Sequence, residues 1–312
     1  MMMCGMLLAT AALTMPPRDT MTVTVDSARH EIRITTGPYH IPATPEGHHP
    51  IMMDPAHNGA LGNFAWPVDG WFRGFRLQLV DGHGAAVPRQ IVHHLVVANL
   101  GRQQVLYPVP EFLLGVGAET EDGEVPTTIG VPMRAGMPLV GFIGWHNQTG
   151  HDFHEVYLTL TLLWTPKDQT PPPASALPMV VDANGGEGAD AITFDIPPGR
   201  SSRKAEFTPR KGGRLLGVGG HLHDYGVDLR LEDAATDSVL VRIEAKRDST
   251  GQVSGIARHL FDSAGKMVTL QAGRRYRVVG TYDNATKETI PGGMALLVGL
   301  FVPDSTSSPA AP

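Results

Sequence analysis

Short alternating runs of apolar and polar residues cover most of this 312-residue chain. Successive side chains of a β-strand point to opposite faces, so a strand with one buried face shows this period of two. Patterns typical of helices are scarce, and 36 Gly and 26 Pro separate the runs as turns. The alternation predicts strands over 22–25, 30–34, 71–80, 88–97, 137–146, 156–164, 191–196, 205–208, 217–231, 238–244, 275–282 and 294–302.

A Pro-rich segment divides this pattern into two halves, each long enough to bury its own core. Short strands with frequent turns favour antiparallel sandwiches. The sequence therefore predicts an all-β protein with two antiparallel β-sandwich (jelly-roll-like) domains in tandem. We expect an N-terminal domain over 20–165, a linker over 166–178, a C-terminal domain over 179–304 and a flexible tail over 305–312.

The N-terminal segment 1–19 is apolar, with small residues near its end, as in the hydrophobic part of a secretory signal. No Lys or Arg precedes Arg18, so the positive region of such a signal is missing. A start codon further upstream would explain this, as would a cytosolic protein with an apolar tail. We expect an extracytoplasmic protein, periplasmic or secreted.

Membranes and nucleic acids are not expected partners. No other run approaches the ~20 apolar residues that a membrane span needs. The formal charge is −6 and no basic run occurs, which argues against nucleic acid.

Histidine changes the picture, because the chain has 14 His and a single Cys. One Cys excludes an intramolecular disulfide framework and a Cys-based zinc cluster. His221 and His223 lie two residues apart on a predicted strand, so both imidazoles point to one face and can bind a divalent metal. Asp224 follows and is expected to hold a ring N–H. By itself such a pair is explained as readily by two incidental histidines on a half-buried strand.

His93 and His94 are adjacent on another predicted strand, where a regular backbone would point them to opposite faces. Both reach one ion only if the strand is bulged, twisted or at a sheet edge. His146 ends a further predicted strand, and we favour it as a ligand over His151 and His154 of the loop that follows.

A third group of candidates lies in the loop EGHHPIMMDPAHNG. A copper-binding loop is one interpretation, since imidazole and thioether both suit copper. A surface loop with coincidental histidines is the simpler one. The residues concerned are His48, His49, Met52, Met53 and His57.

Four motifs, in this order, resemble those of the copper type II, ascorbate-dependent monooxygenases, the family of peptidylglycine α-hydroxylating and dopamine β-monooxygenases. They are VHHLVV, FIGWHNQTG, HLHDYG and GTYDNATKETIPGGM, and the resemblance extends over nearly the whole chain after the N-terminus. It implies two coppers per chain. The N-terminal domain would hold an electron-transfer copper through His93, His94 and His146. The C-terminal domain would hold an oxygen-activating copper through the catalytic ligands His221, His223 and Met294.

Three positions depart from the peptide-processing members of that family. An arginine that holds the substrate carboxylate is replaced by Gly219, and an asparagine and a tyrosine after the methionine are replaced by Leu296 and Val298. The several disulfides usual in the family are also impossible here. A peptidylglycine substrate is therefore not expected, and without the resemblance Met294 would be interpreted as a core residue.

The resemblance predicts a copper-dependent monooxygenase that hydroxylates a C–H bond of a small organic substrate. O2 and ascorbate, or a similar reductant, would be its co-substrates. The alternative is a copper-binding or copper-delivery protein that keeps the ligands without turnover, and reductant-dependent O2 consumption separates the two. A zinc hydrolase is disfavoured because no H-E-x-x-H arrangement accompanies the histidines. Substrate identity and oligomeric state are left open.

Overall fold

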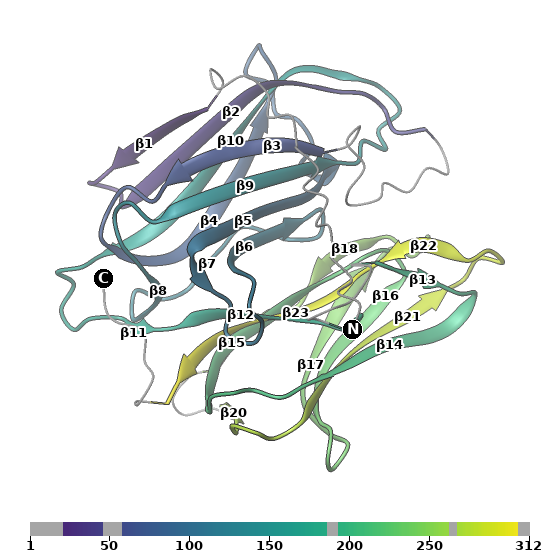
Figure 1. Ribbon diagram of the computed structural model, residues 1–312. Coiled ribbons are helices and arrows are strands. Elements are labelled where there is room, and N and C mark those ends of the chain that lie inside the picture. The colour runs from purple at the N-terminus through teal and green to yellow at the C-terminus, as the bar shows by residue number, and fades with distance from the viewer. Residues whose placement is uncertain (1–20, 46–57, 186–192, 262–266, 305–312) are drawn as a thin grey trace, which may run out of the picture.

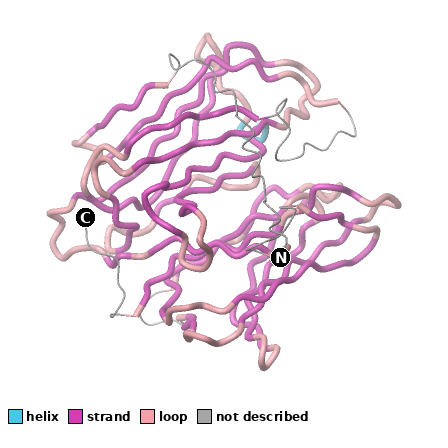
Figure 2. Tube along the Cα trace, viewed as in Figure 1, coloured by secondary structure: helices cyan, strands magenta, loops and turns pink. Residues whose placement is uncertain are grey.

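The computed structural model of the chain describes residues 21–45, 58–185, 193–261 and 267–304 (Figure 1). Strands dominate these residues, and the one described helix is the three-residue 3-10 helix η2 (Arg89–Ile91) (Figure 2). The predicted all-β fold is therefore confirmed. The predicted signal segment, the histidine–methionine loop and the predicted tail lie outside the described residues.

The first sandwich consists of a larger, mostly antiparallel sheet and a smaller antiparallel sheet. Its strands are β1 (Thr22–Asp26), β2 (Glu31–Ile41), β3 (Asn58–Ala65), β4 (Gly70–Val80), β5 (Val92–Gln103), β6 (Pro110–Gly117), β7 (Gly123–Glu124), β8 (Ile129–Met133), β9 (Pro138–Trp145), β10 (Phe153–Pro166) and β11 (Ala174–Ser175). The larger sheet has the order β1-β2-β10-β4-β8-β11, with β7 paired to β4, and the smaller sheet has the order β3-β9-β5-β6.

Strand β10 shows why the alternating pattern produces this sandwich. Leu158, Leu160 and Leu162 each have a relative exposure of 0% and belong to the first hydrophobic core. Successive residues of a strand alternate in direction, so these three leucines share the buried face. β10 pairs antiparallel with β2 on one side and β4 on the other, which places its leucines at the centre of the larger sheet.

The second sandwich is built in the same way. Its strands are β12 (Leu177–Asp182), β13 (Phe194–Ile196), β14 (Gly199–Phe207), β15 (Gly213–Leu222), β16 (Gly226–Asp233), β17 (Ser238–Arg247), β18 (Val253–Ile256), β19 (His259–Leu260), β20 (Val268–Leu270), β21 (Tyr276–Asn284), β22 (Ile290–Gly293) and β23 (Ala295–Pro303). One sheet has the order β12-β23-β15-β19, with β20 paired to β15, and the other has the order β14-β21-β16-β17-β18. β13 and β22 form a separate two-stranded ribbon.

Each sandwich has its own hydrophobic core. The first core is formed by residues from Ile32 to Trp164 and the second by residues from Met179 to Phe301. The predicted linker lies between them, although its exact bounds stay a prediction. Part of it is structured, because β11 pairs parallel with β8, with Ala174 opposite Ile129.

Residues 36–70, where the alternation predicts no strand, contain regular structure. It includes the end of β2 and all of β3. Gly and Pro interrupt the alternation there, and Gly62 has a φ of +116°, next to a register shift between β3 and β9. Partner strands rather than local preference hold this segment extended.

The two sandwiches lie side by side and contact each other (Figure 1). Leu300 of β23 packs against the first core, while Val105 and Leu106 pack against the second. Arg258 of the second sandwich donates hydrogen bonds to the backbone carbonyls of Glu121 and Asp122, at 3.3 and 3.0 Å. The end of β15 and the start of β5 meet at this interface, which brings the histidines of both strands together.

Candidate metal centre

A β-bulge at the start of β5 places two adjacent imidazoles on the same side. In the pairing of β5 with β9, Val92 lies opposite Trp145 and His94 opposite Gly144, so His93 is the additional residue. The ring centroids of His93 and His94 are 4.0 Å apart. The bulge that the sequence requires for both histidines to reach one ion is therefore present.

The H-x-H motif closes strand β15. His221 is its penultimate residue and His223 follows its end, so both rings leave the strand on one side, with centroids 4.9 Å apart. The backbone N–H of His223 donates to the carbonyl of Met294 at 3.3 Å, which joins the motif to the start of β23.

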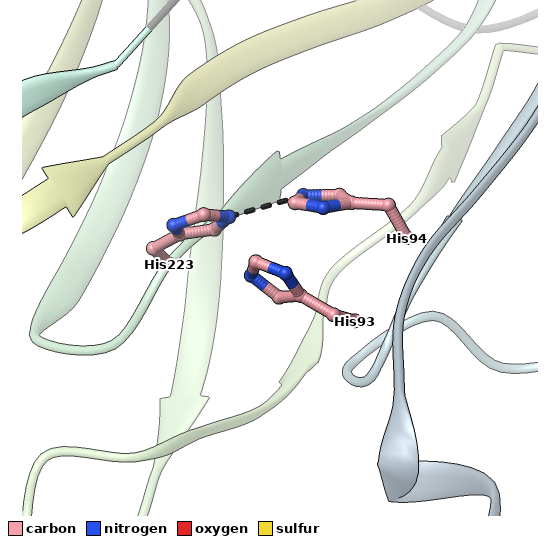
Figure 3. A group of neighbouring side chains, drawn as sticks. All are labelled: His93, His94 and His223. Carbon is pink, nitrogen blue, oxygen red and sulfur yellow. Dashed lines mark hydrogen bonds between the residues drawn. The ribbon is translucent and has the colours of Figure 1, made fainter. Parts of the chain in front are cut away.

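The two histidine pairs converge across the interface between the sandwiches. His94 Nε2 lies 3.0 Å from His221 Nε2 and 3.1 Å from His223 Nε2. The potential ligand atoms of His93, His94 and His223 all lie within 4.8 Å of one another. Figure 3 shows His93 and His94 extending from one strand toward His223 on the other side. These three residues form a group that could hold a metal ion.

The outer nitrogen atoms of the H-x-H motif have acceptor partners. His221 Nδ1 lies 2.6 Å from Glu119 Oε1, and His223 Nδ1 lies 2.5 Å from the carbonyl oxygen of Gly292. Because a carboxylate and a carbonyl can only accept, each Nδ1 carries the proton in these contacts. In the neutral rings each Nε2 then presents a lone pair toward His94.

Burial keeps the imidazoles of His94 and His223 neutral. It lowers the pKa of His94 well below the ordinary value of 6.5, with a further contribution from the neighbouring His93. Burial also lowers the pKa of His223 to about 3, and the positive charge that His221 can carry lowers it further. Neutral imidazole is the form that binds metals, so the environment prepares both rings as ligands at neutral pH.

Glu119 was not among the residues singled out from the sequence. The residue as a whole has a relative exposure of 5%, and burial acts to raise the pKa of its carboxyl. The charge and the hydrogen bond of His221 outweigh burial and hold the pKa of this carboxyl below 4.5. In the sequence it belongs to the acidic run GAETEDGE, where no pattern distinguishes a buried carboxylate from an exposed one.

Asp224, expected to hold a ring N–H, has a described contact elsewhere. Its Oδ1 accepts from the backbone N–H of Val253 at 3.0 Å. Glu119 and the Gly292 carbonyl, both distant in sequence, are the Nδ1 partners of the motif instead.

His146 and Met294 lie near the cluster without being members of its group of three. The ring centroids of His146 and His93 are 5.7 Å apart, and the backbone N–H of His146 donates to the carbonyl oxygen of Ile91 at 2.8 Å. Met294 has a relative exposure of 2%, and its carbonyl accepts from the hydroxyl of Tyr282. Metal binding by either side chain stays a prediction.

Comparison with known proteins adds little to this geometry. No protein family and no curated protein matches the chain. The major capsid protein P2 from bacteriophage PM2 is similar in structure, with 10% identity and a TM-score of 0.38, over 86% of this chain and 99% of that chain. The STIV MCP is similar at 9% identity and a TM-score of 0.40, over 86% and 95%. Such a likeness concerns chain architecture and carries no statement about function.

The expected membership of the copper type II monooxygenase family is wrong. No family matches, and the similar structures named above are viral capsid proteins. The geometry also differs from the expected two separate sites. The resemblance assigns His93 and His94 to the electron-transfer copper and His223 to the oxygen-activating copper, yet their potential ligand atoms lie within 4.8 Å of one another. The predicted oxidoreductase activity on a small organic substrate rested on this family and is wrong with it. The copper-delivery alternative rested on the same family and is set aside.

No helix among the described residues combines the length and the apolar character that crossing a membrane requires. The expectation that the chain holds a metal is confirmed in its general form. A group of histidines that could hold a metal ion is present.

Proposed function

We propose that this chain is a metal-binding protein in which one transition-metal ion joins the two β-sandwiches. The ligands are His93 and His94 from β5 and His223 from the end of β15. The observation that carries this proposal is the convergence of their potential ligand atoms within 4.8 Å, from two separate cores.

Bond lengths support one shared ion. Metal–imidazole bonds of about 2.0–2.1 Å place any two ligand nitrogens at most about 4.1 Å apart, and about 3.3 Å apart in a tetrahedron. The 3.1 Å between His94 Nε2 and His223 Nε2 satisfies this limit. The ligand atoms of the group lie at most 4.8 Å apart, which exceeds the limit of about 4.1 Å by less than about 1 Å. A side-chain shift of under about 1 Å therefore brings them within reach of one ion.

Copper is the metal we propose. Imidazole suits zinc, copper and nickel, and Cu(II) forms the strongest complexes of the divalent series with nitrogen ligands. The sequence predicts two coppers per chain, with His146 and Met294 as further ligands. We propose one ion at the described cluster, and the number of tightly bound equivalents tests the second.

The position of the cluster defines what the ion does. Because the ligands come from both sandwiches, an ion bound to all three fastens one sandwich to the other. Binding to the native arrangement alone stabilises it by mass action. We therefore propose a structural role at the interface, for which no turnover is required.

Metal titration tests the proposal. The metal-free chain is titrated with Cu(II) and separately with Zn(II) against a competing chelator, which counts tight sites only. We expect one tight equivalent per chain, lost in the double variant His93→Ala/His94→Ala and retained in His83→Ala, whose histidine is exposed in a turn of the first sandwich. Equal binding by the double variant and the parent chain would contradict the assignment.

Three further expectations from the sequence are kept as proposals. Reduction of the copper-loaded chain by ascorbate, followed by loss of the Cu(II) spin signal, tests whether that reductant reaches the ion. Cell fractionation tests export. Limited proteolysis within residues 166–173, followed by separation of the fragments, tests the proposed linker.

A further inference from the structure

Glu119 is a buried carboxylate held in a tight turn that follows β6. The backbone N–H of Thr120 donates to the carbonyl of Gly117 at 3.1 Å, and the backbone N–H of Gly117 donates to Thr120 Oγ1 at 3.0 Å. The Thr120 hydroxyl also donates to Glu119 Oε1 at 3.3 Å. These contacts fix the carboxylate, whose burial is costly unless it has a charged or hydrogen-bonding partner.

The partner is His221 of the other sandwich, 102 residues away in the sequence, with Nδ1 at 2.6 Å from Oε1. The side chains of His221 and Glu119 have relative exposures of 13% and 4%, so little water screens this contact. The contact orients the imidazole and places its Nε2 at 3.0 Å from Nε2 of His94, a ligand in the proposed site.

We infer that Glu119 is a positioning residue that makes His221 the fourth imidazole ligand of the metal ion. This inference rests on the proposed function. A carboxylate on the outer nitrogen of a ligating imidazole fixes its tautomer and raises its basicity, and loss of such a partner costs about 10–100-fold in metal affinity. The ion then has ligands from both strands of the interface: His93, His94, His221 and His223.

The two residues of the H-x-H motif differ in how their outer nitrogens are held. His223 donates to a neutral backbone carbonyl, whereas His221 donates to a charged carboxylate from the opposite sandwich. An orienting contact made by a side chain can be removed by substitution, while the carbonyl of Gly292 cannot. The inference is therefore testable at Glu119 alone.

Co(II) is the probe, because tetrahedral Co(II) absorbs strongly in the visible range and reports the number of ligands. Affinity for Co(II) is measured for the full chain and for Glu119→Gln, which keeps the shape and removes the charge. We expect about 10–100-fold weaker binding in Glu119→Gln and partial recovery in Glu119→Asp. Glu121→Gln is the matched control, because this exposed carboxylate lies in the same loop and contacts Arg258 at 3.8 Å.

A second measurement keeps the inference open to failure even if Glu119→Gln does not fold. The nitrogen splitting in the spin spectrum of the Cu(II)-loaded chain counts the bound imidazoles, and His221→Ala should lower that count by one. An unchanged count in His221→Ala, or unchanged Co(II) affinity in a folded Glu119→Gln, would contradict the inference. Glu119 and His221 would then form an ion pair at the interface without taking part in metal binding. If the unmodified chain binds neither metal, the proposed function itself is wrong.

Discussion

His94 and His223 are 129 residues apart in the sequence, yet their Nε2 atoms lie 3.1 Å apart. Each belongs to a different β-sandwich, so this contact exists only when the two sandwiches are assembled. Two half-buried imidazoles in contact, with a third beside them, are a poor use of interface area unless something binds between them. The relationship therefore links metal binding to the assembly of the whole chain.

The first prediction concerns metal-linked stability. Cu(II) at about 100 times its dissociation constant should stabilise the chain by about 2.7 kcal/mol, because it binds the folded arrangement only. His223→Ala should abolish this increment while the metal-free protein still unfolds cooperatively. Thermal unfolding with and without Cu(II) measures both, and His83→Ala should behave like the parent chain. A copper-induced increase of the same size in His223→Ala would contradict the shared site.

The second prediction concerns pH and Asp182 at the end of β12. Burial raises the pKa of its carboxyl to about 6, from 3.8, against the opposing hydrogen bond from the Asn184 backbone and the nearby Arg203. The folded state therefore binds this proton more tightly than the unfolded state. The stability that the protonated carboxyl contributes is present below about pH 4 and is lost as the pH rises through about 6.

Asp182→Asn removes this titration. Between pH 4 and 6.5, the parent chain should lose about 1 kcal/mol relative to the variant, because the side chain is only partly buried and water screens it. Urea unfolding of both metal-free proteins across this range measures the difference. If the stabilities of the two proteins change in parallel with pH, Asp182 does not cause the predicted loss.

The third prediction concerns the first core. Leu160 is fully buried on the central strand β10, so Leu160→Ala should cost about 2–5 kcal/mol through lost burial and the cavity that remains. Val23→Ala on the edge strand β1, where the side chain is 36% exposed, should cost under about 1 kcal/mol. Midpoints of urea unfolding compare the two. Similar losses at both sites would contradict the burial pattern.

The fourth prediction concerns the backbone beside the metal centre. A Cβ at Gly220 would overlap Leu229 Cδ1 and lie 2.7 Å from the carbonyl oxygen of Leu296. Gly220→Ala should therefore cost about 1–3 kcal/mol and weaken Cu(II) binding through the adjacent His221. Gly115→Ala on β6 is the control, because a Cβ there meets nothing within 4 Å. Tight Cu(II) binding by an undisturbed Gly220→Ala would show that the local packing is less restrictive than described.

Local sequence information was sufficient for most strands. Leu158, Leu160 and Leu162 of β10 alternate with threonines because these leucines share the face toward the core, and this period is visible without knowledge of the neighbouring strands. The same rule predicts that His221 and His223 share a side, which the structure confirms. The segment with β3 was missed because glycines obscure the alternation, and pairing with β9 decides its conformation.

The adjacent pair on β5 marks the limit of such reasoning. The sequence shows that His93 and His94 need a bulge to share a site, but a bulge is a mismatch between two strands. Its presence depends on how β5 aligns with β9, where Val97 pairs with Gly141, 44 residues further along the chain. No local pattern encodes that register.

The sequence by itself determined the all-β class, the division into two cores and the fact that histidine, rather than cysteine, is available as a metal ligand. Only the tertiary structure decided which histidines meet. Periodicity specifies the face on which a side chain lies, whereas a cluster made by two sandwiches depends on the surfaces that pack together. His93 and His94 thus lie with His223, and the buried Glu119 contacts His221, because the interface brings their strands together.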